Sequence, residues 1–221
     1  MTIPCQALVA ERLASRPILI NVSGIDGSGK TTQIELLRDW LASSNVMAKS
    51  LKNSAGLRAS SAFFRLTEEA TGDPYAYPPI IPPTLQFFTI ACDTVAPHHA
   101  VVVPLLNEGA TVLLDRNKLC YRAYARAYGA DPTWIDRIFD LVATKGLTLL
   151  YDVRASMSEQ RLRQRTEKPI HGDEAPSFLR EVRKHYLDLA AEDSDVVVID
   201  GEGDIEEVQA RSREALCRFM R

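Results

Sequence analysis

One eight-residue segment constrains this chain more than any other. Residues 24–31 read Gly-Ile-Asp-Gly-Ser-Gly-Lys-Thr and fit the pattern G-x-x-x-x-G-K-[ST]. A short apolar run precedes the segment, and Ile34, Leu37 and Leu41 follow it with helical spacing. This order predicts a buried strand, a glycine-rich turn and a helix whose first N–H groups point at one anion. We therefore expect a phosphate-binding loop.

The chemistry of such a loop assigns a role to each of its residues. Lys30 is expected to reach the β and γ phosphates of a nucleoside triphosphate, and the Thr31 hydroxyl is expected to bind Mg²⁺. The remaining contacts come from backbone N–H groups. The residues predicted to hold the nucleotide are Gly27, Ser28, Gly29, Lys30, Thr31 and Thr32.

Short apolar runs alternate with helical patterns along the chain. The predicted strands are residues 18–22, 46–51, 111–115, 147–153 and 195–200. This alternation is typical of an α/β fold in which helices cover both faces of a central parallel sheet. We expect one domain over residues 1–221. Polar groups at strand ends, such as Asp115, are candidates for function because ligands collect at the carboxyl ends of parallel strands.

Composition excludes several classes of partner. The chain has 26 Lys and Arg against 29 Asp and Glu, a formal charge of −3, so it lacks the basic footprint of a non-specific nucleic-acid binder. We find no secretory signal and no run near the ~18 apolar residues of a membrane span, so we expect neither nucleic acid nor membrane as a partner. The four cysteines are scattered. We interpret them as buried apolar residues or idle thiols in a reducing, cytoplasmic compartment.

A proline-rich segment interrupts the alternating pattern. Residues 72–83 contain five prolines together with Tyr75 and Tyr77. Proline disfavours helix and central strand, so the segment is predicted to be an ordered surface loop. Its two tyrosines either belong to a plain connector or line a pocket, and the sequence leaves both possibilities open.

The second half of the chain carries a cluster of arginines, Arg154, Arg161, Arg163 and Arg165, followed by a loop to about residue 176. Such a cluster is either a solvated charged face or a mobile lid, over about residues 154–176, that clamps phosphates with bidentate hydrogen bonds. The phosphate-binding loop favours the lid.

A phosphate-binding loop, Mg²⁺ and mobile arginines are the parts of a phosphoryl-transfer enzyme. Its acceptor is either water or a small molecule. A GTPase would carry N-K-x-D, whereas Asn117-Lys118-Leu119-Cys120 breaks that pattern at its last position. We therefore expect a small-molecule phosphate acceptor.

Several segments in order resemble thymidylate kinases. Residues 24–33 resemble the family's P-loop, residues 107–116 the strand that ends in its Asp-Arg-Tyr/Phe motif, and Ala123-Tyr124 part of its Ala-Tyr-Gln. Residues 161–165 are similar to the bacterial-type lid, residues 178–190 to the helix after it, and residues 198–200 to the last strand. The resemblance runs from about residue 18 to the C-terminus.

This resemblance implies an ATP-dependent nucleoside monophosphate kinase that uses Mg²⁺ and forms a homodimer. Thr31 and Asp115 would hold the metal, and Arg163 would contact ATP. Asp26 would lie near the acceptor phosphate, which Arg116 would grip. The residues it places in catalysis are Lys30, Asp26, Asp115, Arg116, Arg161 and Arg165.

The chain departs from the family on the acceptor side. Lys52 stands where the family has the Arg of Arg-Glu-Pro, Asn117 replaces an aromatic residue, and the Gln of Ala-Tyr-Gln is Ala125. Counting back from Asp115 places Ile90 and Thr94 where the family has a stacking Phe and a base-reading Arg. The residues predicted to bind the acceptor are Lys52, Phe88, Thr94, Asn117 and Tyr124.

These departures leave the acceptor open. The chain is predicted to phosphorylate dTMP or a modified pyrimidine nucleotide. The alternatives are a kinase for another phosphorylated metabolite or for a nucleoside, or a nucleotide-binding module without kinase activity. Residues 95–106 form either the dimer face or ordinary core, and periodicity does not separate the two.

Overall fold

The computed structural model describes residues 5–52, 59–78, 80–142, 146–165 and 172–221. Its five strands form one parallel sheet in the order β2-β3-β1-β4-β5. The strands are β1 (Leu19–Ser23), β2 (Ala48–Lys52), β3 (Thr111–Asp115), β4 (Gly146–Asp152) and β5 (Val196–Asp200). The predicted parallel sheet is confirmed, and the predicted strand at residues 111–115 matches β3 at both ends.

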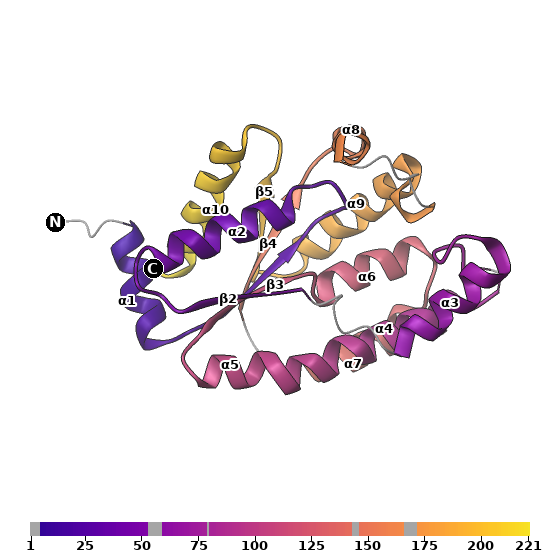
Figure 1. Cartoon of the computed structure of the whole chain (residues 1–221), viewed down its shortest axis with the longest axis horizontal. Helices are drawn as coiled ribbons and strands as arrows, with labels where there is room; N and C mark the ends of the chain where they lie inside the picture. The colour runs from indigo at the N-terminus through magenta and orange to yellow at the C-terminus, as the bar shows by residue number, and fades with distance from the viewer. Residues whose placement is uncertain (1–4, 53–58, 79, 143–145, 166–171) are drawn as a thin grey trace.

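Helices cover both faces of the sheet (Figure 1). Against one face lie α1 (Cys5–Ser15), α2 (Lys30–Ala42) and α10 (Ile205–Phe219), which share a core with Ile20 and Val22. The other face is covered by α4 (Pro83–Pro97), α6 (Lys118–Ala127) and α9 (Pro176–Ala191). Strands that bury both faces explain the continuous apolar runs in the sequence.

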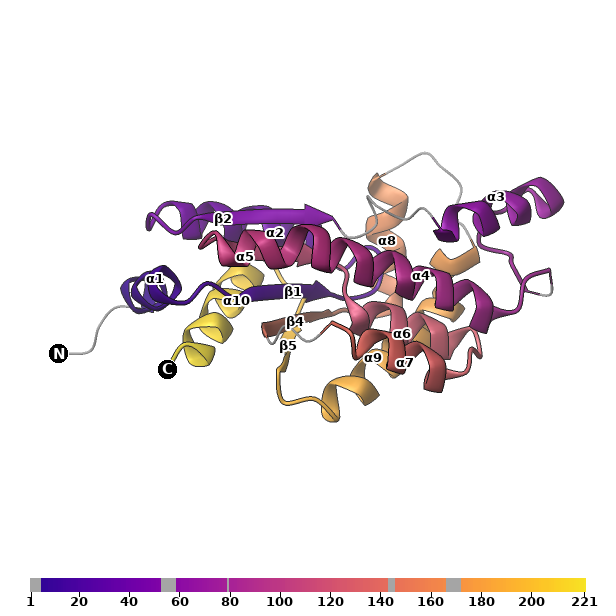
Figure 2. The same cartoon turned by 90° about the horizontal axis from the view of Figure 1, so that it is seen from below.

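The helix α4 continues without a break through a π-helical segment, η2 (His98–Val102), into α5 (Val103–Asn107). This long helix runs along the lower edge of the molecule in Figure 1 and across the front in Figure 2. Over Pro83–Asn107 the helix is, by length and composition alone, long and apolar enough to cross a membrane, which the sequence did not predict, and 33% of the qualifying 18-residue stretch is buried. Its inner face packs on the sheet through Val102, whereas Val101 is 42% exposed.

Three further helices and a short turn complete the described part of the chain. They are α3 (Ala59–Thr71), α7 (Pro132–Phe139), α8 (Ala155–Arg165) and a short 3-10 turn, η3 (Gly172–Glu174). Asp93 of α4 holds the start of α3, because its carboxylate accepts hydrogen bonds from the N–H groups of Ala59 and Ser60 and from the Ser60 hydroxyl. These three bonds tie α3 to the long helix.

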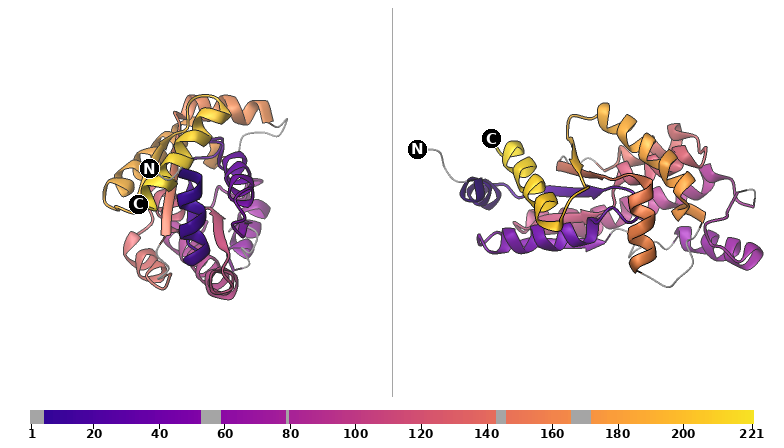
Figure 3. Two further views of the ribbon diagram at one scale, coloured as in Figure 1. Left: turned by 90° about the vertical axis from the view of Figure 1, so that its left-hand side faces the viewer. Right: turned by 90° about the horizontal axis from the view of Figure 1, so that it is seen from above.

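The interpretation of all four cysteines as free is wrong for two of them. Cys5 in α1 and Cys217 in α10 are joined in a disulfide, with Cα atoms 5.7 Å apart. The two helices lie side by side at the end of the molecule away from α3 (Figures 2 and 3). Spacing in the sequence gave no sign of the pair because 212 positions separate its members. Cys92 and Cys120 are free.

Candidate active site

The glycine-rich loop connects β1 to α2 as the sequence predicts. Gly29 is the N-cap of α2 and adopts φ 90°, and Gly27 adopts φ 77°, both in the left-handed region that glycine tolerates. A Cβ atom on Gly27 would lie 2.7 Å from the backbone oxygen of Ser158, so the loop also packs tightly against α8. The N-terminal end of α2 is thus held beside α8, which begins the predicted lid.

Lys30 lies inside the loop. Its side chain is buried, and its Nζ donates hydrogen bonds to the backbone oxygens of Gly24 and Ile25 at 2.9 and 2.8 Å. Burial lowers the pKa of Lys30, and the nearby Asp26 carboxylate, 3.8 Å from Nζ, partly offsets this. The ammonium group therefore adds its positive charge at the place toward which the first N–H groups of α2 also point.

Asp26 connects the loop to the segment after β3. Its Oδ1 accepts a hydrogen bond from Nη2 of Arg116, and its Oδ2 accepts one from the Tyr124 hydroxyl at 3.1 Å. Burial raises the pKa of Asp26, but the charges of Arg116 and Lys30 outweigh it and hold the pKa below its usual value. The carboxylate is thus charged at neutral pH, between two cations.

Arg116 occupies an unusual backbone conformation. Its φ of 67° is rare for a non-glycine residue, and it directly follows the β3 residue Asp115. Burial disfavours its charge, but Asp26 raises the pKa of the guanidinium above its usual value. Backbone strain of this kind is concentrated at functional sites.

These residues open onto one cavity of about 660 Å³. The phosphate-loop side is lined by Asp26, Gly27, Gly29, Lys30, Thr31 and Thr32, joined by Asp115 and Arg116. The opposite side is aromatic, with Phe64 from α3, Phe87 from α4, and Tyr75, Tyr77, Tyr124 and Tyr128. A cationic end and an apolar aromatic end suit a molecule with both a phosphate and a flat ring.

The proline-rich segment contributes two of those rings. Tyr77 is 2% exposed and packs against Tyr128, with ring centroids 4.6 Å apart and the rings tilted by 38°. The Tyr128 hydroxyl also donates to the backbone oxygen of Tyr75 at 3.3 Å. Of the two interpretations left open by the sequence, the pocket-lining one is confirmed.

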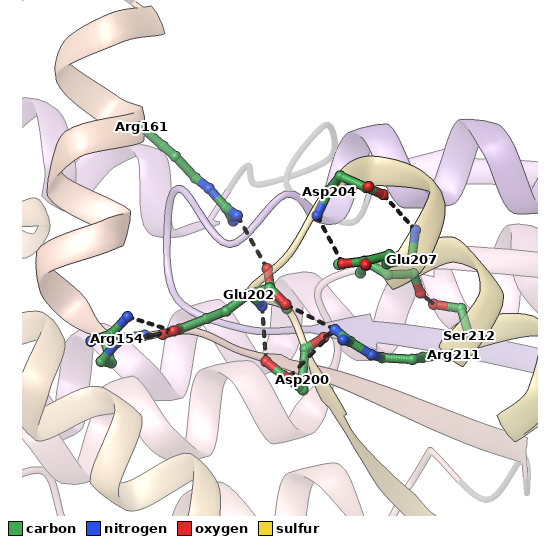
Figure 4. Close-up of polar contacts among 10 residues, drawn as sticks. Arg154, Arg161, Asp200, Glu202, Asp204, Glu207, Arg211 and Ser212 are labelled. Atoms are coloured by element: carbon green, nitrogen blue, oxygen red, sulfur yellow. Dashed lines mark hydrogen bonds and ion pairs between the residues drawn. The ribbon is translucent and has the colours of Figure 1, made fainter.

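Arg161 reaches the cavity from α8. Its guanidinium contacts the backbone oxygen of Gly27 at 3.5 Å and that of Gly201 at 3.1 Å. Figure 4 shows it descending to the turn after β5, where Glu202 binds Arg154 and Arg211 binds Asp200. The base of the predicted lid is thereby attached to both the phosphate loop and the last strand.

Of the three strand-terminal aspartates, only Asp115 faces this cavity. Asp115 is 7% exposed, and its Oδ1 has no hydrogen-bond partner among the described residues. Asp152, by contrast, forms two hydrogen bonds with Arg183, at 2.6 and 2.8 Å. An orphaned carboxylate oxygen in the cavity that Thr31 lines fits the hard oxygen donors that Mg²⁺ requires.

Several predicted site residues lie elsewhere. Phe88 is 41% exposed and does not line the cavity, because the neighbouring Phe87 takes the inward face of α4. Arg163 points to solvent and pairs with Glu159 at 2.7 Å. Ser28 stays in the phosphate loop, but its hydroxyl is shielded from solvent and Ser28 does not line the cavity. The side chain of Arg165 lies outside the described residues.

Two further acceptor-side candidates face a second cavity of about 310 Å³ beneath the long helix. Thr94 donates its hydroxyl to the Ile90 backbone, and Asn117 caps α6 by accepting from the N–H groups of Leu119 and Cys120. Asparagine is a favoured N-cap, which explains its presence there. Lys52 lines both cavities.

Several residues that line the main cavity were not predicted from the sequence. Phe64 lies in α3, for which no helix was predicted, and Cys120 accepts a hydrogen bond from Arg116 at 3.2 Å. Asp173 and Glu174 lie in the segment assigned to the lid, but neither was singled out. The adjacent aromatic pair Phe63-Phe64 was the one local signal that a wall of the cavity lay in this region.

Known proteins with similar sequences decide the family. The sequence model of the thymidylate kinase family matches residues 22–211. The chain belongs to the thymidylate kinase family. A probable thymidylate kinase of Pyrobaculum aerophilum is 32% identical, over 91% of this chain and 97% of its own length. A probable thymidylate kinase of Archaeoglobus fulgidus is 30% identical, over 92% and 96%, and a thymidylate kinase of Kosmotoga olearia is 28% identical, over 86% and 91%.

Family membership confirms the resemblance drawn from the P-loop and from Asp115-Arg116. It also accounts for the α/β architecture around the site. As a thymidylate kinase family member, the chain is a nucleoside monophosphate kinase with ATP as the phosphate donor.

Proposed function

We propose that this chain transfers the γ-phosphoryl group of ATP to dTMP, yielding ADP and dTDP. An oxygen of the dTMP phosphate forms the new bond to the γ-phosphorus, and the bond to the β,γ-bridging oxygen breaks. One observation carries the proposal: Lys30, Arg116 and Asp26 line a single cavity whose far side is aromatic. The relatives described above, each named as a thymidylate kinase, support dTMP as the acceptor.

The roles of the charged residues follow from where they lie. We assign the phosphates of ATP to Lys30 and to the loop with Gly27, Gly29, Thr31 and Thr32. Arg116 would bind the dTMP phosphate, with its guanidinium held in position by Asp26. Phosphoryl transfer requires positioning and charge neutralisation, which fixed cations of this kind supply.

We assign Mg²⁺ to Thr31 and Asp115. The orphaned Oδ1 of Asp115 supports this assignment, because a buried carboxylate oxygen without a donor is rare in proteins. Bound Mg²⁺ would neutralise charge on the transferred phosphate and hold it in line with the acceptor.

The segment of residues 154–176 would act as the lid, with Arg161 as its working arginine. Arg161 already touches the phosphate loop, so a small movement of α8 would bring its guanidinium over the donor phosphates. Arg165 stays a candidate for the same task. Arg163, paired with Glu159 at the surface, is not assigned a contact with ATP.

The aromatic side of the cavity would hold the thymine ring. Phe87 and Tyr77 lie edge to face with ring centroids 6.2 Å apart, and Tyr124 bonds Asp26 between this region and the phosphates. The relatives do not favour another phosphorylated metabolite, a nucleoside, or a module without kinase activity.

We further propose a homodimer formed through the outer face of the long helix and α7. Large apolar side chains are exposed there, namely Leu85, Phe88, Val101, Trp134 and Leu141. Exposed apolar clusters of this kind mark protein interfaces. Static light scattering on the purified chain tests the proposal, and a monomer at micromolar concentration contradicts it. We also propose that residues 1–221 form a single domain and that the protein is located in the cytoplasm.

The deciding experiment is a coupled assay of ADP formation with dTMP, dUMP, dCMP and water as acceptors. We expect dTMP to give the highest kcat/KM and Lys30→Ala to abolish turnover. Turnover of dUMP or dCMP above that of dTMP would contradict the assignment of the acceptor. Activity with water alone would contradict kinase function.

A further inference from the structure

The cavity has a polar group whose purpose the proposed reaction leaves unexplained. Asp173 lies in η3, the turn between the lid segment and α9, and its side chain lines the cavity together with Asp26 of the phosphate loop and with the tyrosines. Its Oδ1 is shielded from solvent and has no hydrogen-bond partner among the described residues. Most buried polar atoms in proteins do have such a partner.

No contact within the described part of the chain gives this carboxyl group a structural role. Asp173 is not the N-cap of α9, since Ala175 holds that position and makes no side-chain cap hydrogen bond. Nor does an ion pair hold it among the described residues, because its charged neighbours include three acidic ones, Asp26, Glu174 and Asp73. Arg116 is the cation among these neighbours, and it is already bonded to Asp26.

The surroundings of Asp173 make an unpaired, ionised carboxyl group energetically unfavourable. Burial, followed by the charges of Asp26 and Glu174, raises the pKa of Asp173 to about 7. Near neutral pH the group is therefore able both to accept and to donate a hydrogen bond. A ligand that supplies the missing hydrogen-bond partner would remove the free-energy cost of burying an unpaired polar group, in addition to forming a new contact.

The tyrosines near Asp173 define which part of a ligand it would meet. Tyr75, Tyr77, Tyr124 and Tyr128 all line the same cavity, and burial, with a further contribution from the charge of Asp173, raises the pKa of each of them. Tyr128 packs on Phe178 of α9, with ring centroids 4.5 Å apart, which ties the aromatic wall to the helix that follows Asp173. Asp173 thus lies close to the rings as well as to Asp26, where it could meet the nucleoside next to the acceptor phosphate.

We propose that Asp173 hydrogen-bonds the nucleoside part of the acceptor nucleotide and sets which nucleotides the cavity accepts. The inference rests on the proposed dTMP kinase activity, because that activity puts a nucleoside against the aromatic wall. The complementary chemistry is a polar hydrogen on the nucleoside, either the sugar 3′ hydroxyl or the N3–H of the base.

The test compares wild type with Asp173→Ala and Asp173→Asn. KM for dTMP is expected to rise about 10- to 100-fold in Asp173→Ala, as for loss of a hydrogen bond to an ionisable group, with kcat changed less than about threefold. Asp188→Ala, an exposed aspartate on α9, is the matched control and should leave KM unchanged. Asp173→Asn, which keeps the size and one acceptor oxygen, guards against a folding defect in the alanine variant.

Two analogues identify the hydrogen that Asp173 recognises. Wild type should lose affinity for 3′-deoxythymidine monophosphate if the partner is the sugar hydroxyl, or for N3-methyl-dTMP if it is the base. The same analogue should lower the affinity of Asp173→Ala little further, because the effects of removing two interacting groups are not additive. If both analogues weaken the variant as much as wild type, the inference is overturned.

Calorimetric binding of dTMP separates this inference from the proposed function. If wild type turns over dTMP and Asp173→Ala has the same KM and Kd, Asp173 has no such role and the kinase assignment stands. If wild type binds dTMP without turnover, the kinase assignment fails, and the ratio of the two Kd values still decides the role of Asp173. If wild type does not bind dTMP, both are overturned.

Discussion

Asp26 and Arg116 are 90 residues apart in the sequence, yet the carboxylate of one accepts a hydrogen bond from the guanidinium of the other inside the main cavity. The contact joins the phosphate loop after β1 to the residue after β3. Both strand ends are neighbours because β1 and β3 pair in parallel, with Val22 opposite Asp115. The topology of the sheet therefore assembles the site that the separate motifs only suggest.

Replacing Asp26 with Asn is expected to lower kcat with dTMP by about 10²–10³-fold, because Arg116 loses the charge that orients it. The pKa of Asp26 is held below its usual value, so its stabilising ion pair is present above about pH 4 and is lost as pH falls through the lowered value. Asp39→Asn is the matched control, since Asp39 pairs with Arg38 at the surface. Equal kcat for wild type and Asp26→Asn would refute this role.

Lys30→Ala is expected to lower kcat by about 10²–10³-fold or more, because one positioned cation over the transferred phosphate is lost. The variant also removes two hydrogen bonds to the backbone oxygens of Gly24 and Ile25. Calorimetry with ATP should show weaker binding, whereas Lys184→Ala, at an exposed lysine, should bind ATP as wild type does. An unchanged kcat would remove Lys30 from the site.

Asp93→Ala is expected to raise KM for dTMP, because it releases α3 and with it the Phe64 wall of the cavity. The carboxylate accepts three hydrogen bonds at the start of α3, and losing such a cap costs about 1–2 kcal/mol of stability. Asp131→Ala removes a helix cap on α7 outside the cavity and serves as the comparison. If both variants shift KM equally, α3 does not shape the acceptor site.

The sequence predicted the parts of this protein that depend on local chemistry. Apolar runs of strand length and the glycines of the phosphate loop follow from burial and from backbone conformation, so β3 and the start of α2 were placed closely. Arg161 and Arg163 have the same side chain, so residue type alone did not show which of them lines the cavity. They are two positions apart on α8, so they point in different directions, and Arg161 alone of the two lines the cavity.

Residues brought in by tertiary packing escaped prediction. Phe87 and Phe88 are equivalent by composition, and the way α4 packs decides that Phe87 turns inward. Asn117 was assigned to the acceptor from its position after Asp115-Arg116, although its side chain serves α6 as a cap. Asp173 belongs to no motif, and it stands out only because its shielded Oδ1 has no hydrogen-bond partner in the part of the chain that the structure describes.

The Cys5–Cys217 disulfide predicts a stability that depends on redox conditions. The denatured protein isolated under oxidising conditions should show two reactive thiols, Cys92 and Cys120, and reduction should raise the number to the four cysteines of the sequence. Because the bridge closes a long loop, reduction is expected to cost about 2–5 kcal/mol and lower Tm. Cys217→Ser should reproduce that loss without reductant. Four reactive thiols before reduction would show that the bridge does not form.

Asp173 predicts a pH dependence of opposite sign to that of Asp26. Its pKa is raised from 3.8 to about 7 in the folded protein, so the folded state binds the proton more tightly than the unfolded state. Ionising the buried carboxyl therefore destabilises the fold as pH rises from about 4 to 7, by at most about 4 kcal/mol, and the penalty is constant above 7. Asp173→Asn cannot ionise, so its stability relative to wild type should increase over that interval. Thermal unfolding of both proteins between pH 4 and 8 measures the difference, and a difference independent of pH would mean that Asp173 is not held in a buried, acidic environment.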